Sequence, residues 1–329
     1  MSEVMERAAL EVEGLRTEFR INGAWYPAVD NVSLRVARNE TLAVVGESGC
    51  GKSVTALSIM GLVQAPGGRV AGGAIRLDGT DIAALPEREK EKLRGDRIGM
   101  VFQEPMTSLN PVMTVGDQVA EVLRIHRGLS RKAALDRARM LFEEVKIPSA
   151  AQRLREYPHQ FSGGMRQRVM IAVALACDPA VLLADEPTTA LDVTIQAQVL
   201  GLLDDLKRRH GMAVVFITHN MGVVAQIADR VAVMYAGQVV EEAPVGAVFA
   251  DPAHPYTRAL FAAIPRLDRA DQELAAIPGR VPPLDAMPRG CRFAARCPLR
   301  QEGCDEPQHL APIAPDHSVR CHVMEKAHA

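Results

Sequence analysis

One glycine-rich segment, GESGCGKS at residues 46–53, constrains the fold of this chain more than any other stretch of its sequence. It follows the apolar run TLAVV (41–45), which has the composition of a buried strand, and it precedes a helical pattern that begins near Lys52. The order of strand, GxxxxGK[ST] and helix is typical of a phosphate-binding loop, in which backbone N–H groups and a helix N-terminus face phosphate oxygens. The chain is therefore expected to bind a nucleotide.

The residues of this loop have separate predicted tasks. Gly49 and Gly51 allow the backbone to curl around phosphate, Lys52 is expected to bridge the β- and γ-phosphates, and the hydroxyl of Ser53 is expected to ligate Mg²⁺. An ordinary glycine-rich turn is the alternative, and the agreement of motif and context argues against it. The full set of predicted cofactor-binding residues in the loop is Gly46, Glu47, Ser48, Gly49, Cys50, Gly51, Lys52 and Ser53.

Apolar runs alternate with helical patterns from about Leu10 to Ala250, which predicts an α/β fold with a mainly parallel core sheet. The runs lie at residues 41–46, 98–102, 180–185, 212–218 and 230–237. Residues 114–177 have helical periodicity and no convincing strand, so an inserted helical subdomain is expected there. Proline-rich, cysteine-containing sequence follows Asp251, and a boundary near residue 265 would divide a domain at 1–265 from a small accessory module at 266–329.

Composition limits the partners of the chain. With 38 basic and 40 acidic residues, the 329-residue chain has no overall positive field that would attract nucleic acid. Its longest apolar run, residues 169–177, is too short to cross a membrane, so contact with a membrane is expected through partner proteins. Four of the six cysteines cluster near the C-terminus, which does not match a secreted disulfide scaffold and favours a reducing, cytoplasmic setting.

Carboxylates end a second apolar strand, VLLADEP at residues 181–187. Downstream of a phosphate loop, Asp185 is expected to bind Mg²⁺ and Glu186 to act as the general base for the attacking water. His219, after the strand AVVFIT, and Gln103, after IGMVF, are further candidates for contacting the γ-phosphate, Mg²⁺ or the water. Each of these residues taken alone is more often a cap, a surface turn or a structural side chain.

A third motif, FSGGMRQR at residues 161–168, separates classes of phosphate-loop ATPase. Ser162 can cap a helix, and Gly163 and Gly164 leave the N-terminus of that helix bare, which creates a second phosphate site. Because the chain already has its own phosphate loop, a second site suggests two subunits that sandwich each ATP. The alternative is an ordinary capped helix.

Taken in order, these motifs resemble those of ABC-transporter ATPases, whose usual signature is LSGGQ. The matching elements are the phosphate loop, Gln103, residues 162–165, Asp185 with Glu186, the TTALD run at 188–192, and His219. The resemblance implies an ABC-type P-loop ATPase fold, ATP and Mg²⁺ as cofactors, and Asp192 of the TTALD run among the nucleotide-binding residues. The sequence departs from the usual signature at Met165, where the family has Gln.

Longer segments are similar to the ATPases of dipeptide, oligopeptide and nickel importers. These segments are QEPMTSLNP (103–111), YPHQFSGGMRQRVMIAVALACDP (157–179), DEPTTALDVTIQAQVL (185–200) and HPYTRAL (254–260). The resemblance implies an ATP hydrolase that powers solute import through two transmembrane permease subunits. It also implies a second, homologous ATPase subunit, an extracytoplasmic solute-binding protein, and a peripheral place on the cytoplasmic face of the inner membrane. The solute stays open between peptides, nickel and other small solutes.

ATPases of this family stack adenine on an aromatic residue upstream of the phosphate loop. Phe19, Trp25 and Tyr26 are the candidates here, and Tyr26 is preferred.

Four cysteines of the C-terminal region, Cys291, Cys297, Cys304 and Cys321, are separated by 5, 6 and 16 residues. Four soft thiolates could hold a metal and fold a module too small to be stable alone. Zinc sites normally contain a tight pair with two intervening residues, which is missing here. The resemblance to peptide importers implies a 4Fe–4S cluster. Iron–sulfur, zinc and unliganded thiols all remain open.

Two other functions compete with import. A soluble ABC ATPase that acts on nucleic acid or ribosomes usually has two fused cassettes or a long coiled-coil insert, and this chain shows neither. A regulatory subunit with little turnover would not need Glu186 and His219, which are both present.

Overall fold

The computed structural model describes residues 8–63, 65–189, 191–263 and 277–328. The chain divides into two compact units, which are described separately. The first contains residues up to Leu10, Val36–Glu40 and Ala84–Phe216, and the second contains Glu11–Arg35, Thr41–Ala83 and Ile217–Ala329. The boundary predicted near residue 265 lies outside the described residues. Within the described ranges, no helix has the length and apolar character needed to span a membrane.

Parallel strands form the buried centre of the first unit. The strands are β6 (Ile98–Val101), β7 (Val181–Asp185) and the first four residues of β8 (Ala213–Thr218). β6 pairs with β7 in parallel, with Ile98 opposite Val181 and Val101 opposite Ala184. Every residue of β6 and β7 is buried, which explains why both read as unbroken apolar runs.

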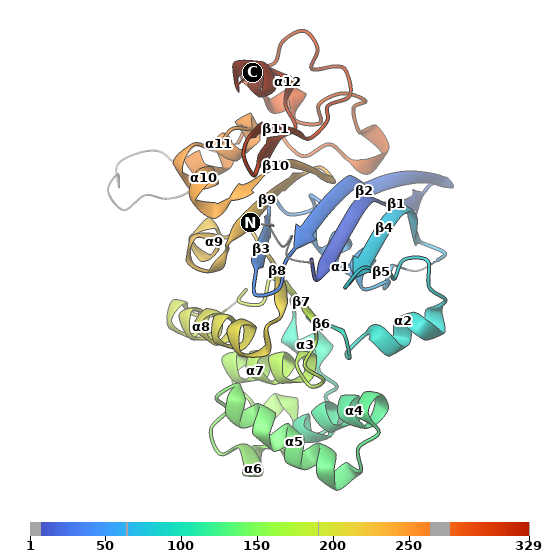
Figure 1. The fold of residues 1–329 in the computed structure, drawn as a ribbon, viewed down its shortest axis with the longest axis vertical. Coiled ribbons are helices and arrows are strands. Elements are labelled where there is room, and N and C mark those ends of the chain that lie inside the picture. The colour runs from blue at the N-terminus through green and yellow to red at the C-terminus, as the bar shows by residue number, and fades with distance from the viewer. Residues whose placement is uncertain (1–7, 64, 190, 264–276, 329) are drawn as a thin grey trace, which may run out of the picture. The chain divides into compact units, whose positions relative to one another are not determined.

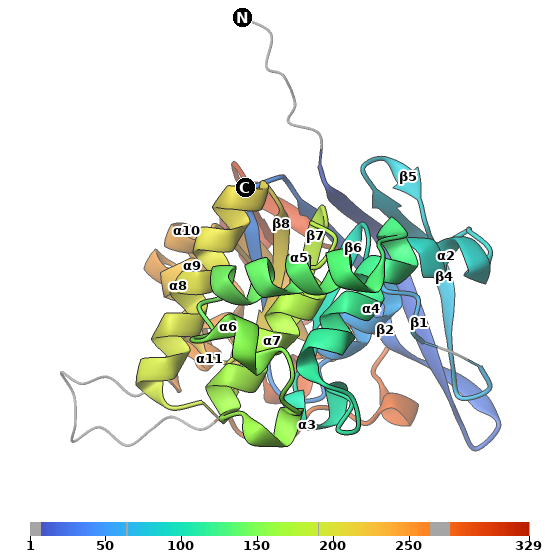
Figure 2. The same cartoon turned by 90° about the horizontal axis from the view of Figure 1, so that it is seen from below.

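Helices form most of the rest of this unit, and Figures 1 and 2 show α5 packed with α4, α6 and α7. Thr114 caps α4, whose buried face includes Val119 and Leu123, and α4 ends at Gly128 in the left-handed conformation. The helices are α2 (Glu87–Leu93), α3 (Pro105–Ser108), α4 (Val115–Arg127), α5 (Arg131–Glu144), α6 (Ala150–Arg153), η1 (Pro158–Gln160), α7 (Gly163–Ala174) and α8 (Val193–His210). Residues 114–177 are thus helical, as the sequence predicts.

The contact between β6 and α7 depends on Gly99. A Cβ atom at this position would lie 2.4 Å from the carbonyl oxygen of Ala174, so an alanine cannot fit without a backbone shift. We expect Gly99→Ala to lower the free energy of unfolding by about 1–3 kcal/mol, measured by urea denaturation. Gly201→Ala is the matched control, because a Cβ there meets open space on α8 and should stabilise by about 0.5–1 kcal/mol. An unchanged midpoint for Gly99→Ala would contradict this packing.

The second unit contains a mixed sheet to which the C-terminal region adds two strands. β3 (Thr41–Val45) pairs in parallel with β9 (Arg230–Tyr235), and β9 pairs antiparallel with β10 (Gln238–Pro244). β10 then pairs antiparallel with β12 (His317–Val319), which pairs with β11 (Ala311–Ala314). The C-terminal region predicted to be an accessory module therefore shares hydrogen bonds with the sheet that contains β3.

An antiparallel sheet and short helices complete the second unit. The sheet has the order β2-β1-β4-β5, and Figure 1 shows β2, β1 and β4 next to one another. Its strands are β1 (Leu10–Ile21), β2 (Ala24–Val36), β4 (Gly68–Leu77) and β5 (Thr80–Asp81). The helices are α1 (Lys52–Ile59), α9 (Met221–Ile227), α10 (Val245–Ala250), α11 (Pro255–Ala262), η3 (Leu284–Ala286), η4 (Ala294–Arg296) and α12 (His322–His328).

The five predicted strands are present within one or two residues, as β3, β6, β7, β8 and β9. The predicted α/β class is confirmed. The sequence did not predict the antiparallel sheet, nor β10, β11 and β12. β11 and β12 have only four and three residues, which is too short for the alternation by which a strand is recognised.

Candidate functional site

The phosphate loop lies in the second unit, between β3 and α1. All five residues of β3 are buried, and α1 begins at Lys52. Gly46, Gly49 and Gly51 all have positive φ angles, which side chains with a Cβ adopt at a cost. The predicted curl of the backbone is therefore present.

Neighbouring backbone holds this loop closely. A Cβ on Gly46 would lie 2.1 Å from the carbonyl oxygen of Met234, and one on Gly51 would lie 2.9 Å from that of Ala28. The N–H of Gly237 donates to the carbonyl oxygen of Cys50 over 2.8 Å. The Cys50 side chain is fully buried, and burial raises the pKa of its thiol. Cys50 is thus a packing residue of the loop.

Lys52 points back along its own loop. Its ammonium group donates to the carbonyl oxygens of Gly46 (2.8 Å) and Glu47 (3.0 Å), and only 6% of the residue is exposed. The N–H of Glu47 donates to the hydroxyl oxygen of Tyr256 over 2.9 Å, so this amide is already engaged. Among the residues predicted to surround phosphate, Glu47 thus contributes contacts within the protein, whereas Ser48 and Gly49 are exposed.

The acidic strand end lies in the first unit. Asp185 is the last residue of β7 and is 5% exposed, and Glu186 follows in the left-handed conformation, which is unusual for a residue with a side chain. The Glu186 carboxylate accepts hydrogen bonds from the amide of Gln103 (3.1 Å) and the hydroxyl of Thr189 (3.0 Å). Because β6 and β7 are parallel neighbours, their carboxyl ends bring Gln103 and Glu186 together.

The signature segment also lies in the first unit. Ser162 caps α7 by accepting the N–H of Met165, and Asp192 caps α8 by accepting that of Ile195. Gly164 packs so closely on α8 that a Cβ would lie 2.6 Å from a methyl group of Ile195. A groove of about 530 Å³ is lined by Ser162, Gly163, Gly164, Met165, Leu191 and Asp192, together with Lys146, Pro148, Arg168, Ile195 and Gln198. The predicted residues Ser162–Gly164 and Asp192 therefore face one groove, while Ala190 of the TTALD run lies outside the described residues.

The remaining predicted nucleotide contacts lie in the second unit with the phosphate loop. His219 is exposed directly after β8, and the next residue, Asn220, caps α9. Tyr26 and Trp25 are half-buried on β2, and the guanidinium of Arg69 lies 4.2 Å from the centre of the Trp25 ring. Arg69 therefore covers one face of the Trp25 ring.

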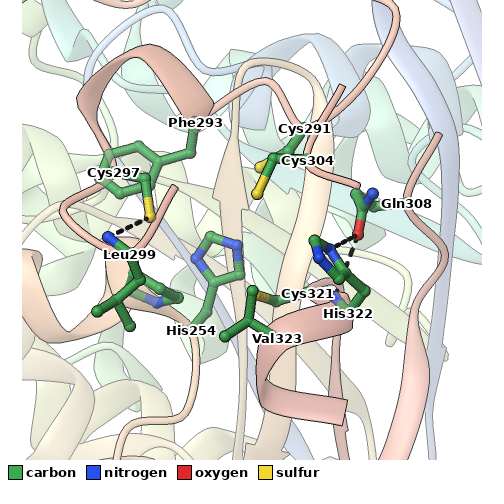
Figure 3. A pocket seen from close by; sticks show the side chains of 11 residues that line it. His254, Cys291, Phe293, Cys297, Leu299, Cys304, Gln308, Cys321, His322 and Val323 are labelled. Atoms are coloured by element: carbon green, nitrogen blue, oxygen red, sulfur yellow. Dashed lines mark hydrogen bonds between the residues drawn. The ribbon is translucent and has the colours of Figure 1, made fainter. Parts of the chain in front are cut away.

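The four C-terminal cysteines line one pocket in the second unit, although they are spread over 31 positions of the chain (Figure 3). Cys291, Cys297 and Cys304 point into this pocket beside His254, and Cys321 lies at its other side. The sulfur atoms of Cys297 and Cys304 accept hydrogen bonds from the N–H groups of Leu299 (3.4 Å) and Gln301 (3.5 Å). We call this cluster the thiol pocket.

The cysteines of the thiol pocket form no disulfide bond. Burial, with further contributions from the neighbouring thiols, raises the pKa of Cys291 to about 11, and burial also raises the pKa of Cys297. Burial likewise lowers the pKa of His254 to about 3, so this imidazole is neutral. Over the described ranges, no group of three or more His, Cys, Asp or Glu residues is arranged to hold a metal ion.

Sequence reasoning missed three residues beside the phosphate loop: Tyr256, Arg292 and Arg296. Tyr256 belongs to the HPYTRAL segment, which indicated a family but no contact. Arg292 and Arg296 lie between Cys291 and Cys297, in a segment that was considered only for its cysteines. Their contacts join residues more than 200 positions apart, and a single sequence carries no signal for such pairs.

Comparisons with known proteins agree along nearly the whole chain. Residues 29–189 match the family described as ABC transporter, and residues 240–304 match the one described as oligopeptide/dipeptide transporter, C-terminal region. The chain is 50% identical to the oligopeptide transport ATP-binding protein AppD of Bacillus subtilis, over 96% of this chain and 97% of AppD. It is 52% identical to a putative peptide import ATP-binding protein of Brucella abortus, over 95% and 96% of the two chains.

Solved structures give the same result. The dimeric structure of MJ0796, described as a bacterial ABC transporter cassette, has a TM-score of 0.64 and 30% identity, covering 72% of this chain and 98% of that one. CbiO1 from Clostridium perfringens has a TM-score of 0.63 and 25% identity, covering 75% and 92%. The chain therefore belongs to the ABC transporter ATP-binding proteins, in the group that carries the oligopeptide/dipeptide transporter C-terminal region.

Proposed function

We propose that this chain is the ATP-hydrolysing subunit that powers import of dipeptides or oligopeptides through partner permease subunits. The observation that carries the proposal is 50% identity over 96% of the chain to AppD, an oligopeptide transport ATP-binding protein. Identity over 96% of the chain includes most of the C-terminal region, part of which matches the oligopeptide/dipeptide transporter family at residues 240–304. Nickel and other small solutes are the competing cargoes.

The residues at hand suit MgATP as substrate. Lys52 supplies a positive charge for the β- and γ-phosphates, and the hydroxyl of Ser53 and the buried carboxylate of Asp185 are the oxygen donors that Mg²⁺ prefers. When bound, Mg²⁺ neutralises charge on the phosphate oxygens. Tyr26 stacks on adenine, and His219 and Gln103 help to position the γ-phosphate and the attacking water.

Glu186 acts as the general base of hydrolysis. Its carboxylate oxygen already accepts two hydrogen bonds, from Gln103 and Thr189, so the orientation of the side chain is fixed before water arrives. A base whose orientation is fixed loses less freedom in the transition state.

Two such subunits close on ATP head to tail. Ser162, Gly163, Gly164 and Asp192 face the groove of the first unit, and they bind the ATP held by the phosphate loop of a second ATPase subunit. The dimer of MJ0796 supports this arrangement. Closing and reopening of the pair drives the permeases, and an extracytoplasmic solute-binding protein delivers the peptide. We also propose that the chain lies at the cytoplasmic face of the inner membrane, with residues 1–265 as the ATPase domain and 266–329 as its accessory module.

Co-purification tests this function. The tagged chain is recovered from detergent-solubilised membranes of its own cells, and the bound proteins are identified by mass spectrometry. We expect two permeases and a second, homologous ATPase subunit, with ATPase activity stimulated by a peptide-loaded binding protein. Stimulation by a nickel-loaded binding protein alone would show that nickel, and not peptide, is the imported solute. Recovery only with ribosomes or DNA would overturn the proposal.

The thiol pocket is proposed to hold a 4Fe–4S cluster. The support is its donor set: four cysteines converge on one pocket, and backbone N–H groups point at two of the sulfurs, as at known cluster sites. The cluster would replace the four thiol protons and cross-link segments that have little core of their own. It lies outside the residues assigned to hydrolysis, and no step of hydrolysis depends on it.

Iron analysis of anaerobically purified protein tests this cluster. We expect about four iron atoms per chain and broad visible absorbance, both lost in Cys304→Ser. Cys177→Ser, which changes a cysteine of the first unit, is the control and should retain both signals. A colourless, iron-free sample would refute the cluster. An iron-free sample that contains about one zinc ion per chain would show that the pocket is a zinc site instead.

A further inference from the structure

The segment CRFAARC, residues 291–297, contacts the thiol pocket at its two ends and the phosphate-loop region just inside them. Its two cysteines, Cys291 and Cys297, line the thiol pocket. Its two arginines, Arg292 and Arg296, are the direct neighbours of these cysteines and reach the phosphate loop or the turn beside it. We call residues 291–297 the clamp segment.

Arg296 binds Glu47, the second residue of the phosphate loop, with both ends of its guanidinium. The two nitrogen–oxygen distances are 3.0 and 3.1 Å, the geometry of a bidentate pair. The same guanidinium donates to the carbonyl oxygens of Pro278 (2.8 Å) and Ile277 (3.2 Å) and to the hydroxyl of Tyr235 (3.3 Å). Only 6% of the Arg296 side chain is exposed, so its position is set by the C-terminal region.

Glu47 connects Arg296 to Lys52, because it has hydrogen bonds with both residues. Its carboxylate is held by Arg296, its N–H by the hydroxyl of Tyr256, and its carbonyl oxygen accepts the ammonium of Lys52. Tyr256 is fully buried, so water does not compete for this second contact. The place of the Lys52 ammonium therefore depends on groups of the C-terminal region.

Arg292 provides a second link. It donates to the carbonyl oxygen of Ala236 over 2.5 Å and pairs with Asp30. The next residue, Gly237, donates its N–H to the carbonyl oxygen of Cys50 in the loop. Between the two arginines, the buried ring of Phe293 packs against Tyr235 and Tyr256 with ring centres 5.2 and 5.4 Å apart, which fixes the clamp segment in place.

We propose that the clamp segment positions the phosphate loop through Arg296 and Glu47. Nucleotide affinity then depends on the cysteines of the thiol pocket, because Cys291 and Cys297 hold the two ends of this segment. Exposed ion pairs contribute little, but this pair is bidentate, largely buried on the arginine side and supported by three further hydrogen bonds. The proposal rests on ATP binding by the loop and is independent of the imported solute.

A double-mutant cycle on nucleotide affinity tests the positioning role. The dissociation constant for MgATP is measured by calorimetry on the full chain with Arg296→Gln, Glu47→Gln and the double variant. We expect about a tenfold weaker affinity for each single variant and no further loss for the double variant, because one interaction has been removed in each case. Arg296→Lys keeps the charge without the fork and should recover part of the loss.

Arg300→Gln is the control, since the side chain of this arginine of the same region pairs with the exposed Asp305 and its loss should leave affinity unchanged. Thermal unfolding of each variant shows whether weaker binding results from a displaced loop or from loss of the fold. We expect weaker binding in variants that still unfold cooperatively. Wild-type affinity for Arg296→Gln, or losses that add in the double variant, would overturn the positioning role.

The link to the thiol pocket is tested by Cys297→Ser and, independently, by Cys291→Ser. We expect each to weaken MgATP binding several-fold in the wild-type background and to have no further effect when Arg296 is already Gln. Cys177→Ser is the control and should bind as the wild type does. Wild-type affinity in both pocket variants, or an equal loss with and without Arg296, would refute the link while leaving the ATPase function standing.

Discussion

Replacing Glu186 with glutamine is expected to lower the rate of ATP hydrolysis about 100-fold or more, because an amide cannot take a proton from the attacking water. The change keeps the size of the side chain, and a Gln oxygen can still accept the hydrogen bonds of Gln103 and Thr189. ATP binding should therefore remain. Phosphate release and the dissociation constant for MgATP, measured on the same preparation, check both halves of the prediction.

The control for Glu186→Gln is Glu143→Gln. Glu143 is an exposed carboxylate of α5 that pairs with Arg139, so it tests removal of one negative charge from the same unit. This variant should hydrolyse ATP at the normal rate. If Glu186→Gln also did so, Glu186 would not be the base.

Replacing Lys52 with alanine is expected to weaken MgATP binding about 100-fold, since a charge-assisted contact with phosphate in a buried site contributes about 1.5–3 kcal/mol. Lys52 begins α1, is 6% exposed, and has no neighbouring cation within the loop to replace it. Hydrolysis should fall with binding. Calorimetric titration with MgATP gives the affinity directly.

Lys92→Ala is the matched control for Lys52→Ala, because Lys92 is an exposed lysine on α2 whose partner is Glu89. It should bind MgATP like the wild type. The pair of active-site variants also separates two roles, since Lys52→Ala should lose binding and Glu186→Gln should keep it. Wild-type affinity in Lys52→Ala would contradict the phosphate-loop assignment.

Local patterns predict the parts of this protein that are themselves local. The strand, loop and helix around Lys52 are adjacent in sequence, and the buried strands β3, β6 and β7 read as continuous apolar runs. Gln103 and Glu186 are each predicted from their own strand end, and they meet because β6 and β7 are parallel neighbours. In these cases the physical cause lies within a few residues or in a regular sheet.

Contacts of the C-terminal region could not be predicted in the same way. The pairing of Arg296 with Glu47 joins positions 249 residues apart, and neither side chain is unusual for an exposed surface. β11 contains Pro312 and half of its residues are exposed, so no alternation marks it as a strand. The four cysteines were recognised as a group, but their spacing alone did not indicate that Arg292 and Arg296 face the phosphate loop.

The most direct test of the whole account is peptide transport across the membrane of reconstituted vesicles. The complex of permeases and ATPase subunits is reconstituted with the peptide-loaded binding protein inside the vesicles, and ATP is supplied on the side of this chain. The account predicts ATP-dependent movement of labelled peptide toward the ATP side with the wild type and its loss with Glu186→Gln. Peptide movement that persists with Glu186→Gln, or ATP hydrolysis without movement of peptide, would contradict it.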